Sequence, residues 1–191
     1  MTRRLLVLAL VAAGSAVLAA TASSSGRARS SLQRPLHLPH VASGARCPVS
    51  HVDGRIPFVR RFGVAVGIGQ GPAYPIGIPK GRLDLAPARN FDSRKWAGQK
   101  VLWLVLPRYR GPVLIRGGRI DRPGRVRFDS GNVPPLSLRI GPTTTSGNPT
   151  SPVPPPGTRY RPSFTRVRGP GCYAYQIDGT SFSRVVVFRA V

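Results

Sequence analysis

The chain has 191 residues, and its 22 glycines and 21 prolines exclude a fold of long helices, because neither residue is stable in a helix interior. Hydrophobic residues make up 41 %, enough to build a core, which excludes a chain that is disordered throughout. The 29 Lys and Arg residues outnumber the 6 Asp and Glu residues, giving a formal net charge of +23. Two interpretations of this charge stay open. It attracts polyanions such as cell-wall polymers, anionic lipid headgroups or nucleic acid, or it reflects a GC-rich coding sequence that scatters arginine over a solvated surface.

The start of the chain has the pattern of an export signal. Two arginines precede an apolar run over 5–18, and small residues follow. This pattern predicts a signal peptide over 1–22 that is cleaved after Ala20 or Ala22. The alternative is an uncleaved membrane anchor, although the run is shorter than the ~20 apolar residues of a spanning helix. We therefore expect an extracytoplasmic protein, secreted or held at the cell envelope, with no membrane span after cleavage.

Residues 23–45 contain Ser, Gly, Arg and Pro without a periodic apolar pattern, which predicts a flexible linker. The folded domain is then expected over 46–191. Its two cysteines, Cys47 and Cys172, form a disulfide in an oxidising compartment, and the bridge would close a loop between the start of the domain and its penultimate strand. A free buried thiol and a reactive nucleophile are the alternatives.

Short apolar or alternating runs separated by Gly and Pro predict an all-β domain, an antiparallel sandwich or barrel. The run over 100–106 is continuously apolar after Lys100, as in a central strand buried on both faces. The segment over 178–181 is predicted to turn the chain, and Asp178-Gly179 at its start, between two β-rich runs, predicts a hairpin. Residues 142–156, rich in Pro and Thr, predict a partly polyproline loop. The predicted strand segments are 58–68, 73–78, 100–106, 113–115, 125–128, 136–140, 173–177 and 182–191.

No catalytic, metal or cofactor motif is recognisable. The glycines of 67–71 precede Pro72 and no helix, so they do not form a dinucleotide-binding turn. The three histidines all precede residue 52, and two of them fall in the proposed linker, where nothing fixes a tetrahedral metal geometry. Asp121, Asp129 and Asp178 stand at turn-like positions, where aspartate caps turns for structural reasons. We therefore expect a protein that is not an enzyme and holds neither a metal nor a cofactor.

Two triplets that place a tyrosine between arginines are the best candidates for a polyanion-binding surface, because such residues pair with anions and stack on sugars or bases. The alternative is that the tyrosines fill the core while the arginines are solvated. The candidate residues are Arg108, Tyr109, Arg110, Arg159, Tyr160 and Arg161.

Several segments resemble a group of exported bacterial proteins of unknown function. Residues 171–179, 182–183 and 185–188 are similar to the closing hairpin of that group, and 103–105 with 111–117 are similar to its central segment. The resemblance implies a small immunoglobulin-like β-sandwich at or beyond the cell envelope, and it brings no known activity. In true immunoglobulin domains the cysteine follows the tyrosine by two residues, whereas here it precedes the tyrosine.

Together these features predict an exported, disulfide-linked, immunoglobulin-like β-sandwich. The expected function is a non-catalytic binding or structural module whose partner is an anionic cell-wall polymer or glycan, with only nonspecific contacts to nucleic acid. The alternatives are a secreted hydrolase whose site the sequence does not reveal, and a secreted domain whose charge has no specific target. The sequence gives no indication of the oligomeric state.

Overall fold

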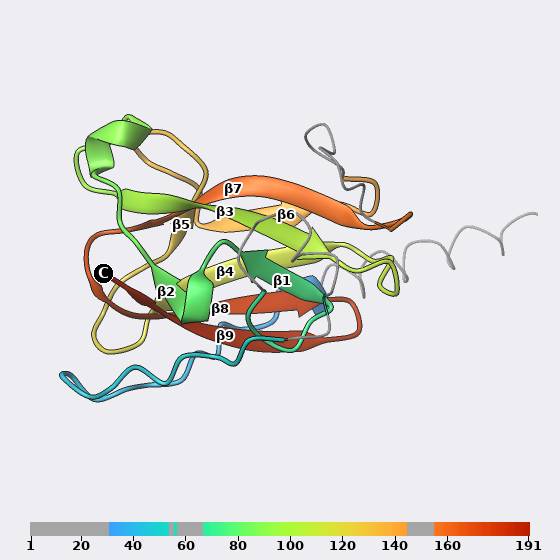
Figure 1. Ribbon diagram of the computed structural model, residues 1–191, viewed down its shortest axis with the longest axis horizontal. Coiled ribbons are helices and arrows are strands. Elements are labelled where there is room, and N and C mark those ends of the chain that lie inside the picture. Colours follow the sequence, from blue (N-terminus) through green and yellow to red (C-terminus); the bar gives the residue numbers. More distant parts are fainter. Residues whose placement is uncertain (1–30, 54–55, 57–66, 145–154) are drawn as a thin grey trace, which may run out of the picture.

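The computed structural model describes residues 31–53, 56, 67–144 and 155–191, which form two β-sheets with almost no helix (Figure 1). Two short 3₁₀ helices, η1 (Pro79–Gly81) and η2 (Ala88–Phe91), join strands. Within the described ranges, no helix is long and apolar enough to cross a membrane. The signal peptide predicted over 1–22, most of the strand predicted over 58–68 and most of the loop predicted over 142–156 lie outside the described residues.

The first sheet has four antiparallel strands in the order β1 (Ala73–Ile76), β3 (Ala97–Val105), β7 (Arg159–Val167) and β5 (Arg127–Phe128). Strand β3 contains the apolar run over 100–106 up to Val105 and lies between β1 and β7, so the prediction of a central strand is confirmed.

The second sheet is mixed where an antiparallel one was expected, because its edge strand β2 (Arg82–Leu83) runs parallel to β9 (Ser183–Ala190). The hairpin predicted around 178–181 is present between β8 (Gly171–Gly179) and β9, and its turn lies in the second half of that segment. The Gly179 N–H donates to the Phe182 carbonyl at 2.9 Å, which leaves Thr180 and Ser181 as the central turn residues. The strands of this sheet follow the order β2 (Arg82–Leu83), β9 (Ser183–Ala190), β8 (Gly171–Gly179), β4 (Val113–Arg119) and β6 (Ser137–Ile140).

The core lies between the two sheets and is centred on aromatic rings. Tyr175 of β8 meets Trp103 of β3 edge to face at 5.0 Å and stacks on Phe188 of β9 at 4.4 Å. Its hydroxyl lies 2.6 Å from the Thr165 hydroxyl of β7, and complete burial raises the pKa of Tyr175. Alternate residues of β8 thus face the other sheet, as the sequence pattern predicts.

The opposite face of β8 is covered by residues 31–50, which we call the N-terminal strap. In Figure 1 the strap follows the side of β8 and β9 that faces away from the four-stranded sheet. Leu38 and Val41 pack against Ile120 and Ala174, and the Val41 N–H donates to the Ile120 carbonyl at 2.8 Å. The strap includes 31–45, the described part of the segment expected to be a flexible linker.

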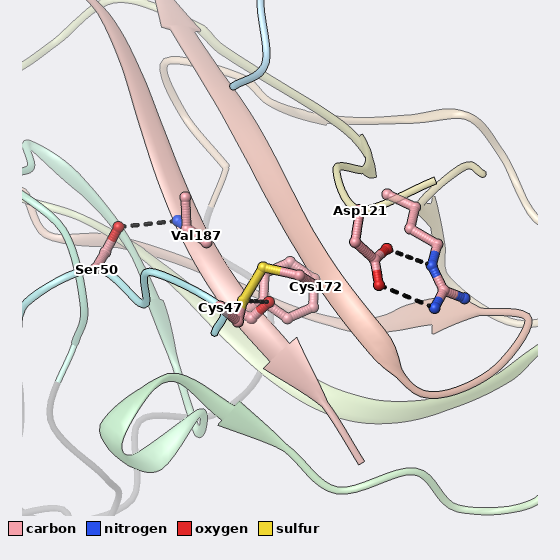
Figure 2. The surroundings of a disulfide bond; sticks show 7 residues. Cys47, Ser50, Asp121, Cys172 and Val187 are labelled. Atoms are coloured by element: carbon pink, nitrogen blue, oxygen red, sulfur yellow. Dashed lines mark hydrogen bonds and ion pairs between the residues drawn. A yellow bond between two sulfur atoms is a disulfide. The ribbon is translucent and has the colours of Figure 1, made fainter. Parts of the chain in front are cut away.

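Two further contacts hold the C-terminal part of the strap. Cys47 and Cys172 form the predicted disulfide, with their Cα atoms 5.5 Å apart, and the bridge lies on the outer face of the five-stranded sheet (Figure 2). The Val187 N–H donates to the Ser50 hydroxyl at 2.9 Å. The strap is therefore covalently and non-covalently attached to β8 and β9.

Candidate functional site

The structure brings the two arginine-tyrosine triplets, 108–110 and 159–161, close together, but the contacts between them are mainly buried inside the protein. Arg159 is only 4 % exposed. Its guanidinium donates to the Tyr109 and Gly111 carbonyls, both at 2.9 Å, and to the Gly141 carbonyl at 2.6 Å. Desolvation is the main cause that lowers the pKa of Arg159. Arg159 therefore stabilises the loops around it and does not reach a ligand on the surface.

The other triplet residues are divided among different environments. Tyr109 is 8 % exposed and donates its hydroxyl to the Pro112 carbonyl at 2.8 Å. Tyr160 packs against an apolar cluster on the outer face of the first sheet, and Arg161 pairs with Asp129 at 2.9 Å. Only Arg108 and Arg110 are exposed, so the six predicted residues do not form one ligand surface.

A denser group of cations surrounds a pocket of about 1060 Å³ beside the disulfide, which we call the disulfide pocket. The strap, η1, β2, the segment after β4 and the ends of β8 and β9 all contribute to its lining. Its single acidic side chain is Asp121. Its basic side chains are Arg46, Lys80, Arg82, Arg119, Arg122 and Arg189.

Strand register and the disulfide explain why these distant residues meet. In the β8–β9 ladder, Arg189 lies directly opposite Cys172. In the parallel β2–β9 pair, Arg82 lies opposite Arg189. The bridge to Cys172 brings Cys47, and with it the adjacent Arg46, to the same place. The sheet and the bridge thus place three arginines from separate segments around one opening.

Two of the cations are neutralised by neighbouring carboxylates. Arg119 forms a two-point ion pair with Asp121, with Nε–Oδ1 at 2.6 Å and Nη2–Oδ2 at 3.2 Å (Figure 2). This bond raises the pKa of Arg119 and holds the pKa of Asp121 below its usual value. Arg82 pairs with Asp84 at 2.7 Å, but both side chains are largely exposed.

The remaining four cations lack such partners. Arg46, Lys80, Arg122 and Arg189 are exposed, and none of their side chains forms a hydrogen bond or ion pair with another residue of the described ranges. Guanidinium and ammonium groups in this state bind phosphate, sulfate or carboxylate groups. Because the pocket lining contains no aromatic ring, it offers no platform for stacking a base or a sugar.

The pocket lacks the groups of a hydrolytic site. Its lining includes no histidine, and both cysteines are joined in the disulfide. Among the residues that the structure describes, no three His, Cys, Asp or Glu side chains lie close enough to hold a metal ion. The arrangement is suited to binding anions by charge.

The Arg119–Asp121 pair predicts a specific pH dependence of stability. Because the pKa of Asp121 is lowered from 3.8, the pair stabilises the fold above that pH and less as the pH falls through the lowered pKa. We expect Asp121→Asn to lower the free energy of unfolding by about 1 kcal/mol at pH 7, and we expect this difference to shrink as the pH falls through the lowered pKa of Asp121. Urea unfolding over a pH series from 7 downwards measures this, and a difference that persists unchanged at low pH would contradict it.

No family model, curated protein or solved structure matches the chain. The resemblance to exported bacterial proteins of unknown function therefore remains a prediction that rests on the sequence segments themselves.

Proposed function

We propose that the protein is a non-catalytic binding module for an anionic polymer of the cell envelope, and that the disulfide pocket is its binding site. The observation that carries this proposal is the group of four exposed cations, Arg46, Lys80, Arg122 and Arg189, which have no described carboxylate partner. All four line the same pocket, so an anionic group bound there would reduce their mutual repulsion.

The lining of the pocket favours a charged glycan or a phosphodiester chain without bases, such as a polyol phosphate, over nucleic acid. Proteins that bind single-stranded nucleic acid combine a basic groove with exposed aromatic rings, on which bases stack. The disulfide pocket has the basic residues without the rings. Polymers that carry carboxylate or phosphate groups on a flexible chain need only the charge.

We further propose that the chain is exported. The signal pattern over 1–22 and the disulfide both fit an oxidising compartment outside the cytoplasm. The immunoglobulin-like assignment stays a prediction. The two layered sheets agree with it, whereas immunoglobulin domains join their two sheets by a disulfide and this bridge joins the strap to β8.

Replacing the four unpaired cations tests the site. The variant Arg46→Gln/Lys80→Gln/Arg122→Gln/Arg189→Gln is expected to bind polygalacturonate roughly 100-fold more weakly at about 0.1 M salt, because four charge contacts are lost. The slope of log affinity against log salt concentration is expected to fall by about one per removed cation. Isothermal titration calorimetry over a salt series provides both quantities.

A control variant with the same charge change separates a site from general attraction. Lys100→Gln/Arg108→Gln/Arg110→Gln/Arg139→Gln also removes three arginines and one lysine, all exposed and outside the disulfide pocket. It is expected to lose less than about threefold in affinity. Fully methyl-esterified polygalacturonate, which has the same backbone without the charge, is expected not to bind. Equal losses in the two variants, or tighter binding of poly(dT), would overturn the proposal.

Removing the carboxylate that pairs with Arg119 is expected to strengthen ligand binding, in contrast to the loss expected when cations are removed. Asp121→Asn removes the only acidic side chain of the pocket lining and frees the Arg119 guanidinium. We expect affinity for polygalacturonate at pH 7 to rise about fivefold, which is roughly the effect of one partly exposed ion pair. Unchanged or weaker binding would show that the ligand does not enter the pocket.

A further inference from the structure

A second cationic pocket, of about 360 Å³, lies next to the first, and we call it the Trp96 pocket. Four arginines line it: Arg119, Arg125, Arg127 and Arg168. No carboxylate contributes to the lining. Positive charge is therefore even less compensated here than in the disulfide pocket.

Two of these arginines enclose an indole ring. The guanidinium carbons of Arg127 and Arg168 lie 4.9 Å and 5.0 Å from the centroid of Trp96, which is only 5 % exposed. Arg127 also donates to the Pro134 carbonyl at 2.5 Å, and its Nε is buried without a hydrogen-bond partner. Packing on the ring holds the guanidinium groups in place while leaving them capable of pairing with an anion.

Arg119 is part of the wall of both pockets. Its Nε and Nη2 bind Asp121 on the side of the disulfide pocket, and its Nη1 donates to the Tyr173 hydroxyl at 3.3 Å on the side of the Trp96 pocket. The guanidinium carbon lies 5.3 Å from the centroid of the Tyr173 ring. A fixed arginine thus separates two adjacent sites for anionic groups.

We infer that the two pockets are subsites of one groove, and that the ligand is a linear polymer with regularly repeated anionic groups that is long enough to occupy both. This inference rests on the proposed function and adds the chemical class of the ligand. A single phosphate or a monosaccharide acid fills one subsite. A chain that reaches the second subsite binds there without a further loss of translational freedom, so its affinity increases with length.

Oligogalacturonates of defined length provide the probe, and Trp96 provides the signal. The dodecamer is expected to bind roughly 100-fold more tightly than the trimer, with one dodecamer per protein chain. Only the dodecamer is expected to change tryptophan fluorescence, because its anionic groups pair with the guanidinium groups that contact Trp96, whereas Trp103 is fully buried. The variant Trp96→Phe should abolish the change. Glycerol-phosphate oligomers of matched charge test whether phosphodiesters behave as carboxylates do.

The variant Arg125→Gln/Arg168→Gln tests the second subsite. It is expected to reduce dodecamer affinity to within about threefold of trimer affinity and to leave trimer affinity unchanged. The variant Arg89→Gln/Arg139→Gln, with the same charge change at exposed positions outside both pockets, should retain the gain with length.

The outcomes separate this inference from the proposed function. The inference alone would be overturned if the trimer binds at the disulfide pocket and the dodecamer binds no more tightly than the trimer. It would also be overturned if two dodecamers bind per protein chain, or if the tighter binding of the dodecamer persists in Arg125→Gln/Arg168→Gln. If trimer and dodecamer both bind no better than their methyl esters, the proposed function fails and the inference fails with it.

Discussion

The double substitution Cys47→Ser/Cys172→Ser is expected to lower the free energy of unfolding by about 4 kcal/mol. The bridge spans 125 residues, so it restricts the unfolded chain over most of the described domain. It also attaches the strap to β8 and forms part of the wall of the disulfide pocket. We therefore expect weaker binding of anionic polymers together with the loss of stability. Guanidinium denaturation followed by tryptophan fluorescence measures the first effect.

Reduction of the wild type supplies the control for this prediction. Wild-type protein in dithiothreitol should unfold at the same denaturant concentration as the double variant, and dithiothreitol should not affect the variant. A change in unfolding free energy below about 1 kcal/mol would mean that the strap detaches without affecting the sheets, contrary to the prediction.

Asp178→Ala is expected to destabilise the fold by about 3 kcal/mol. The Asp178 carboxylate is completely buried on the outer face of β8. It accepts hydrogen bonds from Arg116 Nη2 at 2.7 Å, from the Ser183 hydroxyl at 2.7 Å and from Gln176 Nε2 at 3.0 Å. Arg34 of the strap lies 3.8 Å away. Alanine leaves these donors without their acceptor, and the unpaired charge of Arg116 accounts for most of the cost.

An exposed ion pair serves as the control for Asp178. Asp84 pairs with Arg82 at 2.7 Å, but its side chain is 59 % exposed. Asp84→Ala should therefore cost no more than about 0.5 kcal/mol. Asp178→Asn, which keeps an acceptor oxygen but loses the charge, is expected to fall between the two. Equal effects of Asp178→Ala and Asp84→Ala in urea unfolding would contradict the assigned role.

The sequence predicts the strands whose apolar residues alternate or run continuously. Strands β1, β3, β4, β5, β6, β8 and β9 all overlap predicted segments, and the disulfide follows from the presence of only two cysteines. Strand β2 is too short to give a pattern, and its parallel pairing with β9 has no local signal.

Strand β7 could not be predicted because its buried side chains are largely polar. Thr165 is bonded to Tyr175, Ser163 to Asp129, and Arg159 to carbonyls. Tertiary hydrogen bonds therefore take the place of the apolar periodicity that marks a strand in the sequence. The strap was not predicted for a similar reason, since it is held by scattered contacts rather than by a continuous apolar face.

The candidate site was only partly accessible from the sequence. The prediction of arginine-tyrosine triplets relied on neighbours in the chain, whereas the cations of the disulfide pocket come from separate segments. One signal was available. The predicted hairpin pairs Cys172 with a residue near Arg189, and the predicted disulfide adds Arg46, so these two predictions together bring both arginines close to each other.

The most direct test of the central claim is to map the ligand by NMR, using the side-chain Nε–Hε signals of arginine during titration with oligogalacturonate. The account predicts that Arg46, Arg122 and Arg189 shift first and saturate together, while the exposed Arg89, Arg139 and Arg184 shift little. Small, linear and unsaturable shifts of similar size at every exposed arginine would contradict it, because they would show that the charge attracts polyanions without a site.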